Sequence, residues 1–413
     1  MMVKKNNLLL GFIVIFISFF TYSGYYAGLG ILLEVLGNSA SRLYSIPVRL
    51  LYCVFCLIFV FYMSAIYFKS NFKVKKNIVF LFCSTVLFLL YLFFQYLINI
   101  NGNITTDKSY EVAFYLVAYA IFPFLFYSVI NYNKYKKMIT YVSIISGFIL
   151  GVISIVLYHD ILGSSVGRIS ALRYEGVDNF ISPLSLSYSA SLTMTLSIFY
   201  WLNSQPKKIM KIFLSFCVAV SLFVFLLGAS RGSLLTIFAC FLIYFVTFNI
   251  KKLIMGASAF ISLILVAYYA ASYSGSSIFE RFLNLEDAYS NNDSSVTGRL
   301  DIWREAISLI KSSPIVGGNF EANHIYPHNI FLESLMSTGI FPFLIFIFIT
   351  FYGVVLSIQA YIRDKEYLPF VLLTHGVVMG LFSGSLYTSI LYFVGLGLVI
   401  SYFNYINRGS ISF

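Results

Sequence analysis

Charged residues are scarce in this chain. Only 10% of its 413 residues are Asp, Glu, Lys or Arg, and 60% are hydrophobic, whereas about a quarter of the residues in an ordinary soluble protein are charged. This deficit excludes a water-soluble globule. Because a membrane-spanning helix needs about 20 apolar residues, the composition instead indicates a chain that lies mostly within a lipid bilayer.

Cysteine and histidine are also rare. The five cysteines all lie within apolar runs, which argues against both a disulfide framework and a thiolate metal site. Of the four histidines, His324 and His328 are four positions apart, but they lack the intervening acid of a helical zinc site and straddle Pro327. Phosphate-loop, dinucleotide-binding and Gly-x-Ser-x-Gly motifs are missing. We therefore expect no metal and no cofactor.

Apolar runs between polar clusters predict the fold class. It is an all-α, polytopic integral membrane helix bundle, with residues 1–413 as a single domain. We expect twelve spans, at 8–23, 46–68, 78–98, 110–130, 138–158, 181–202, 209–228, 234–250, 253–271, 330–358, 368–386 and 387–403. The first span follows Lys4 and Lys5 and is expected to be retained, because a convincing cleavage site is lacking.

The cations sort between alternate loops by residue type. One set of loops carries 15 Lys and 2 Arg, which marks the cytoplasm and places both termini there. Because the cations lie in loops that set the membrane orientation, we attribute the net charge of +11 to membrane topology and expect no nucleic-acid partner. The other set carries 8 Arg and 2 Lys with 14 of the 16 acids. Arginine suits bidentate binding of phosphate, although pairing with the outer acids is an equally good explanation for any one of them.

The longest hydrophilic stretch, 272–328, is predicted to form a large periplasmic loop that carries part of the active site. Its centre, from Ser294 to Pro314, shows apolar residues at helical spacing, which predicts an amphipathic helix on the outer membrane surface. Pro327 suits a first helical position and Gly339 a helix end. In such a helix Glu333 points about 140° away from His328, so we expect no proton relay between them.

Ionisable groups are few within the predicted spans, and His375 is the clear case at mid-span. An ion-coupled transporter places several carboxylates or paired charges near the midplane. The sequence therefore argues against a pump or symporter. We interpret His375 as a hydrogen-bonded structural residue.

The predicted outer face gathers a set of candidate binding groups: Arg231 between two spans, Arg299 in the amphipathic helix, His328, and Arg168 with Arg173 after the fifth span. Together they could hold a diphosphate and supply a base. Each also has a plainer interpretation. Arg231 could be an interfacial cation, and His328 could be a capping or packing residue.

The order of motifs on this face resembles the O-antigen polymerase and O-antigen ligase superfamily. It runs from Gly298-Arg-Leu-Asp-Ile-Trp303 through Gly317-Gly318 to His328-Asn329, nine residues and Gly339. Ligases of the superfamily carry a second glycine three positions after the first. Pro342 stands there in this chain.

The resemblance implies a metal-independent membrane glycosyltransferase of the GT-C-like type in the bacterial inner membrane. Its donor and acceptor would be undecaprenyl-diphosphate-linked glycans, and a polysaccharide chain-length regulator is a further expected partner. It implies that Arg231 and Arg299 bind the diphosphate and that His328 is the base or orients the acceptor. We assign Arg168, Arg173, Arg304 and Asn329 to substrate binding.

Three functions remain open at this point. We favour an O-antigen polymerase, because Pro342 departs from the ligase motif and the composition is similar to that of polymerases. The alternative is an O-antigen ligase that transfers polymer to the lipid A core. A flippase for lipid-linked oligosaccharides is the third, but it should carry its cations in a central cavity, whereas here they crowd the outer surface.

Overall fold

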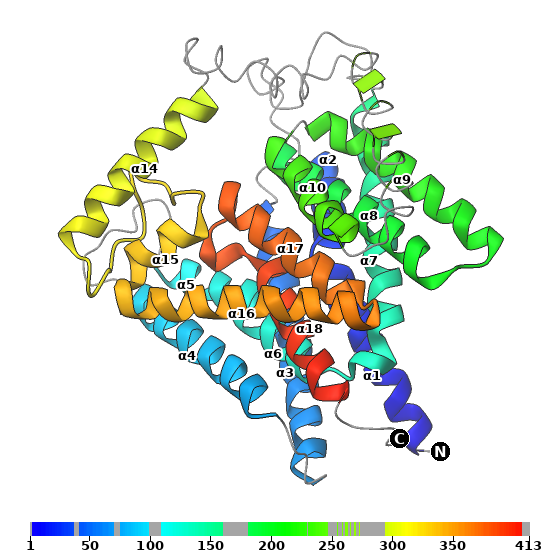
Figure 1. The fold of residues 1–413 in the computed structure, drawn as a ribbon, viewed down its shortest axis with the longest axis horizontal. Helices are drawn as coiled ribbons and strands as arrows, with labels where there is room; N and C mark the ends of the chain where they lie inside the picture. Colours follow the sequence, from blue (N-terminus) through cyan, green and yellow to red (C-terminus); the bar gives the residue numbers. More distant parts are fainter. Residues whose placement is uncertain are drawn as a thin grey trace. The chain divides into compact units, whose positions relative to one another are not determined.

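The computed structural model describes residues 2–36, 41–69, 75–98, 109–159, 181–228, 230–246 and 294–406, together with isolated positions between 254 and 272. Within these ranges the regular elements are all helical, apart from one isolated bridge between Ala322 and Ile325. The predicted all-α class is therefore confirmed for the described residues (Figure 1).

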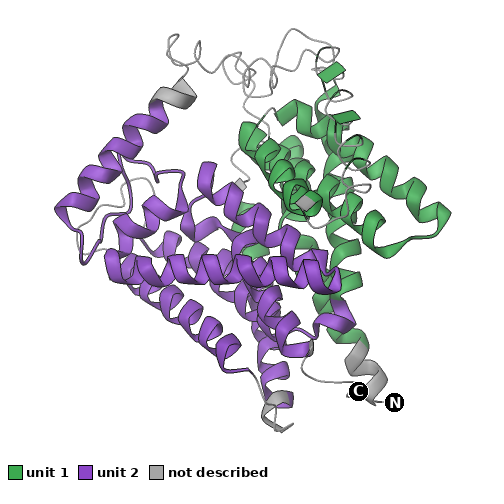
Figure 2. Cartoon of the chain, viewed as in Figure 1, with its two compact units in different colours: residues 1–51, 136–285 green, residues 52–135, 286–413 purple. Residues whose placement is uncertain are grey.

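The chain divides into two compact units, 1–51 with 136–285 and 52–135 with 286–413 (Figure 2). Unit 1 contains α1 (Met2–Phe20), α2 (Ser23–Leu36), α8 (Pro183–Ser204), α9 (Lys208–Gly228), α10 (Arg231–Val246), most of α7 (Tyr132–Leu157) and the first part of α3 (Ser41–Lys69). In this unit α8 packs against both α9 and α10. Ser and Thr along α8 are buried. The hydroxyls of Thr193 and Thr195 donate to backbone carbonyls four residues earlier, which satisfies these two groups within the helix.

Unit 2 contains α4 (Lys76–Ile98), α5 (Ser109–Leu116), a π-helical turn η2 (Val117–Ile121), α6 (Phe122–Val129), α14 (Ser294–Ser312), α15 (Ile330–Thr338), α16 (Ile340–Asp364), α17 (Tyr367–Phe382), a 3₁₀ turn η5 (Leu386–Thr388) and α18 (Ile390–Ile406). One buried apolar core joins α4, α5, α15, α16, α17 and α18. This core is the scaffold on which α15 and the turn before it are mounted.

Six helices among the described residues are long and apolar enough to cross a membrane: Leu43–Ile66, Lys76–Ile98, Ser109–Val129, Tyr132–Leu157, Lys208–Gly228 and Ile340–Asp364. The pair Leu8–Phe20 and Ser23–Val35 passes the same test together with a bend of 67°, and three shorter apolar helices lie at Arg231–Phe245, Tyr367–Phe382 and Ile390–Tyr405. These helices support a multi-pass membrane protein.

Eleven of the twelve predicted spans fall on helices, and the span at 253–271 is described only at isolated positions. Three details differ from the prediction. The stretch after residue 23, predicted as a loop, contains α2. The span at 330–358 is broken at Gly339 into α15 and α16. The last span begins as the 3₁₀ turn η5 before α18. That every span crosses the membrane stays a prediction.

Candidate functional site

The segment after α14 runs back along the end of α15. Gly318 N–H donates to the Ser337 carbonyl at 2.8 Å, Asn319 N–H donates to Met336 at 3.2 Å, and Ile340 N–H donates to Pro314 at 2.9 Å. The last carbonyl groups of a helix have no N–H donor within the helix. The segment satisfies two of them and thereby locks α14 to the junction between α15 and α16.

This junction requires glycine at two positions. Gly339 has φ +74°, and a Cβ there would meet the Ile315 carbonyl oxygen. Gly317 has φ +69°, and a Cβ there would lie 2.5 Å from the Gly339 nitrogen and 2.7 Å from the Ser337 oxygen. Other residues rarely adopt such φ angles. The backbone therefore explains why glycine stands at positions 317 and 339 of the motif.

The predicted amphipathic helix is present as α14, which contacts α15 (Figure 1). Trp303 on α14 donates its indole N–H to the Pro327 carbonyl at 2.8 Å. A small core of Ala306, Ala322 and Met336 joins α14, the segment that follows it and α15. These contacts fix α14 against the residue that directly precedes His328.

The start of α15 differs from the prediction. Asn329 is its N-cap, and its Oδ1 accepts from the backbone N–H groups of Phe331 at 3.0 Å and Leu332 at 3.2 Å. Pro327 therefore lies before the helix, because an Asn side chain caps the free N–H groups better than an extended helix would. His328 stands outside the helix, so the prediction that His328 and Glu333 lie on one helix is wrong.

His328 has a left-handed backbone with φ +54°. Its ring is half-buried and lies 4.4 Å, centroid to centroid, from that of Tyr326. The imidazole forms a hydrogen bond with the backbone of Ser383, at the end of α17. Nδ1 is buried and has no hydrogen-bond partner among the described residues.

Three influences act on the His328 imidazole. Burial lowers its pKa most, the positive charge of Arg299 lowers it further, and the hydrogen bond with Ser383 acts in the opposite direction, with a net lowering from 6.5. A lowered pKa keeps the ring neutral near pH 7, and a neutral imidazole has one ring nitrogen with a lone pair that can accept a proton. The structure thus brings together two of the predicted site residues, His328 and Arg299.

Glu333 is a buried group that the sequence reasoning set aside. Its carboxylate accepts from the Tyr96 hydroxyl at 3.1 Å and from the Leu386 backbone N–H at 2.7 Å. The residue lies on α15, outside the six candidate spans. The sequence signal that could have found it is its isolation, since it is the only acid between Glu321 and Asp364.

The other predicted site residues have different surroundings. Arg231 begins α10 in unit 1, whereas Arg299 and His328 belong to unit 2, so the predicted diphosphate clamp stays a prediction. Arg304 forms an exposed ion pair with Asp301 at 3.2 Å. Pairing with an acid is the alternative to phosphate binding that the sequence left open for each outer arginine. Arg168 and Arg173 lie outside the described residues.

Two further questions concern a possible metal site and the interpretation of His375. Within the described part of the chain, no three His, Cys, Asp or Glu side chains gather closely enough to hold a metal ion, and metal independence stays a prediction. His375 is fully buried, and its Nδ1 lies 3.1 Å from the Val371 carbonyl, as expected for a structural histidine.

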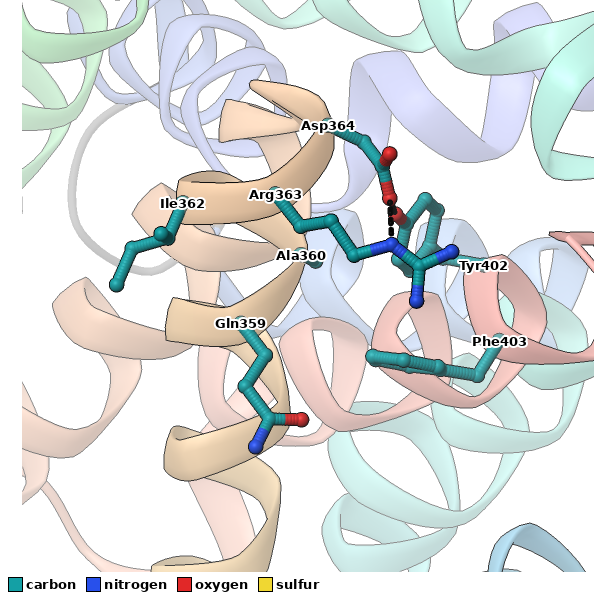
Figure 3. A pocket seen from close by; sticks show the side chains of 7 residues that line it. All are labelled: Gln359, Ala360, Ile362, Arg363, Asp364, Tyr402 and Phe403. Atoms are coloured by element: carbon teal, nitrogen blue, oxygen red, sulfur yellow. Dashed lines mark hydrogen bonds and ion pairs between the residues drawn. The ribbon is translucent and has the colours of Figure 1, made fainter.

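A cavity of about 330 Å³ opens at the far end of α16 (Figure 3). It is lined by Gln359, Ala360, Ile362, Arg363, Asp364, Tyr402 and Phe403. Tyr402 donates to the Asp364 carboxylate, and Arg363 lies 3.4 Å from the same oxygen. The 25 residues of α16 span about 37 Å at 1.5 Å per residue. The cavity is therefore remote from the Gly339 junction and forms no part of the candidate site.

Comparison with known proteins bears on this same segment. Residues 216–347 match the sequence model of the family described as O-antigen ligase. No curated protein and no solved structure matches the chain. The matched range contains Arg231, and it contains Arg299, His328 and Gly339, which belong to the motifs whose order indicated the resemblance. The matched segment is similar to this family, which agrees with the resemblance of its motifs to the O-antigen ligase and polymerase superfamily.

Proposed function

We propose that the chain polymerises undecaprenyl-diphosphate-linked oligosaccharide repeat units into O-antigen or another surface polysaccharide. It would act at the periplasmic face of the bacterial inner membrane. The observation that carries the proposal is the arrangement at His328. The pKa of His328 is lowered by burial and by the positive charge of Arg299, and its Nδ1 is buried. Both residues lie within the segment that matches the family.

The arrangement suits glycosyl transfer. A sugar hydroxyl is a weak nucleophile, and a base that removes its proton accelerates attack by about 10² to 10⁴. In the proposed step, the neutral His328 imidazole takes the proton of the acceptor hydroxyl, whose oxygen forms a bond to the anomeric carbon of the donor. The bond between that carbon and the diphosphate oxygen breaks, and undecaprenyl diphosphate leaves.

Arginine would stabilise the leaving group. The diphosphate gains negative charge as the bond breaks, and a guanidinium fork binds its oxygens in pairs. We assign this role to Arg299 and Arg231, with Arg168, Arg173 and Arg304 as further contacts to the substrate. The N-cap uses Oδ1 of Asn329, and we assign its Nδ2 donor to the substrate.

An O-antigen ligase is a second candidate, favoured by the description of the matched family. Pro342, which replaces the second glycine of the ligase motif, lies in the first turn of α16. Proline is accommodated there because first-turn N–H groups have no acceptor within the helix. Pro342 thus preserves the fold of the junction, and the acceptor must be determined by assay.

The test uses purified protein with lipid-diphosphate repeat units, with and without lipid A core. A polymerase gives a ladder of lipid-linked products and free undecaprenyl diphosphate without the core. A ligase gives product only when the core is supplied. We expect product to form in excess chelator. Loss of product on chelation, restored by Mg²⁺ or Mn²⁺, would contradict a metal-independent reaction and redirect attention to Asp287, Asp293 and Asp301.

A further inference from the structure

Glu333 is a fully buried carboxylate that the proposed reaction does not use. Its two hydrogen bonds join three parts of unit 2: α15, which carries it, α4 through Tyr96, and the turn before α18 through Leu386. Burying a carboxylate costs much free energy unless its hydrogen bonds are made. A residue that binds three segments at such a cost calls for a role beyond apolar packing.

The turn that Glu333 holds is the one that contacts His328. Ser383 N–H and Gly384 N–H both donate to the Met379 carbonyl, at 2.9 and 3.0 Å. Ser389 Oγ donates to the Ser385 carbonyl at 2.6 Å. The bonds to Met379 anchor the start of the 383–389 turn to the end of α17, the Ser389 bond lies within the turn, and the Leu386 N–H joins the turn to Glu333 on α15. The Ser383 backbone, which bonds the His328 imidazole, belongs to this turn.

A row of rings provides a second connection from Glu333 to His328. The Tyr96 ring lies 5.8 Å from that of Tyr387, which lies 6.2 Å from that of Tyr326. The Tyr326 ring lies 4.4 Å from the His328 ring. The contacts of Tyr96 with Tyr387 and of Tyr387 with Tyr326 are edge-on, and such contacts favour defined orientations. Movement of Tyr96 therefore changes the packing around His328.

We propose that Glu333 is a positioning residue, which fixes the His328 imidazole through the 383–389 turn and through the Tyr96, Tyr387 and Tyr326 rings. The catalytic meaning of this role rests on the proposed function of His328, whereas the positioning itself rests on the contacts alone. Glu333 acts as a hydrogen-bond acceptor in this role. It needs neither a negative charge nor a transferable proton.

The test compares Glu333→Gln with Glu333→Leu. The glutamine amide oxygen can accept from Leu386 N–H while its amide nitrogen donates to the Tyr96 oxygen, so both links survive. Leucine removes both. The readout is the pKa of His328, measured by NMR titration of ¹³C,¹⁵N-histidine-labelled full-length protein in nanodiscs. The second readout is kcat and KM for lipid-diphosphate repeat units.

We expect Glu333→Leu to lower the pKa of His328 further, because the Ser383 bond that raises it is loosened. We expect kcat to fall by about ten- to a hundredfold, since displacement of a reacting group by about 1 Å has effects of this size. KM for the donor should stay unchanged. Glu333→Gln should keep the wild-type pKa and kcat.

A smaller substitution covers the case in which Glu333→Leu does not fold. Tyr96→Phe removes one hydrogen bond and keeps the ring, so it should lower the pKa of His328 by less. Its matched control is Tyr132→Phe, because the Tyr132 hydroxyl donates to Glu366 at 2.8 Å beyond the opposite end of α16. The control removes an equivalent bond and should leave the pKa of His328 unchanged.

Two results would overturn the proposal. One is a Glu333→Gln protein as impaired as Glu333→Leu, which would show that the charge or the proton matters. The other is an unchanged His328 pKa in both Glu333→Leu and Tyr96→Phe. The titration needs no substrate, so wild-type protein that makes no glycan product would refute the proposed function and leave this inference to be decided by the pKa values.

Discussion

At the residue scale, His328 combines a left-handed backbone with a half-buried ring. A non-glycine residue in this backbone region costs about 1–3 kcal/mol and persists only where its surroundings impose it. The surroundings here are the Asn329 cap on one side and the Trp303 bond to Pro327 on the other. Such strain is frequent at functional sites, which agrees with the proposed role.

The first prediction concerns His328→Ala. Loss of the base should lower glycan formation at least about a hundredfold, while the protein still inserts and binds the lipid-linked donor. The measurement is product yield together with donor binding. His324→Ala is the matched control, because His324 also has a left-handed backbone but is exposed. Near-normal turnover of a well-folded His328→Ala protein would remove the catalytic assignment.

The second prediction concerns pH and Arg299. The base must be neutral, so the acidic limb of kcat/KM should lie below pH 6.5, because the pKa of His328 is lowered. Arg299→Ala removes a charge that lowers this pKa, so the limb should move to higher pH. Arg299→Lys should keep the limb but lose the fork, with reduced kcat. Full activity of Arg299→Lys would reduce Arg299 to a surface cation.

At the element scale, the break between α15 and α16 determines where His328 lies. The third prediction is that Gly339→Ala prevents correct folding or greatly lowers thermal stability, because φ +74° and the Ile315 carbonyl exclude a Cβ. The matched control is Gly298→Ala in α14, where a Cβ meets nothing within 4 Å. That change should raise stability, by about 0.5–1 kcal/mol. Melting temperatures in detergent measure both, and equal stability of the two variants would contradict the junction described.

Sequence periodicity predicted α14 well, because its apolar spacing and its serine and proline boundaries are local signals. The start of α15 was predicted wrongly, at Pro327. A proline at a first helical position and an asparagine N-cap are both good local signals. In the structure the helix begins after the asparagine cap, and the bond from Trp303 to the Pro327 carbonyl holds the proline outside the helix.

At the scale of the whole molecule, the sorting of Lys and Arg predicts topology. The fourth prediction is that both termini and the 69–77 loop face the cytoplasm, and that the 272–328 loop faces the periplasm. A single cysteine introduced at Asn291 should react with a membrane-impermeant reagent in cells with a permeable outer membrane. A cysteine at Lys73 should react only after the inner membrane is opened. Protection of the Asn291 position in intact cells would overturn the topology.

The sequence by itself determined the fold class, the positions of most helices and the order of the family motifs. These follow from hydrophobicity and spacing, which are properties of neighbouring residues. The tertiary structure alone decided the environment of His328 and the role proposed for Glu333. The Tyr96 hydroxyl reaches Glu333 across 237 residues of sequence, and the Leu386 N–H reaches it across 53. Burial and hydrogen bonding between such distant residues arise only when the helices pack, because no local pattern records which backbone group a buried carboxylate will meet.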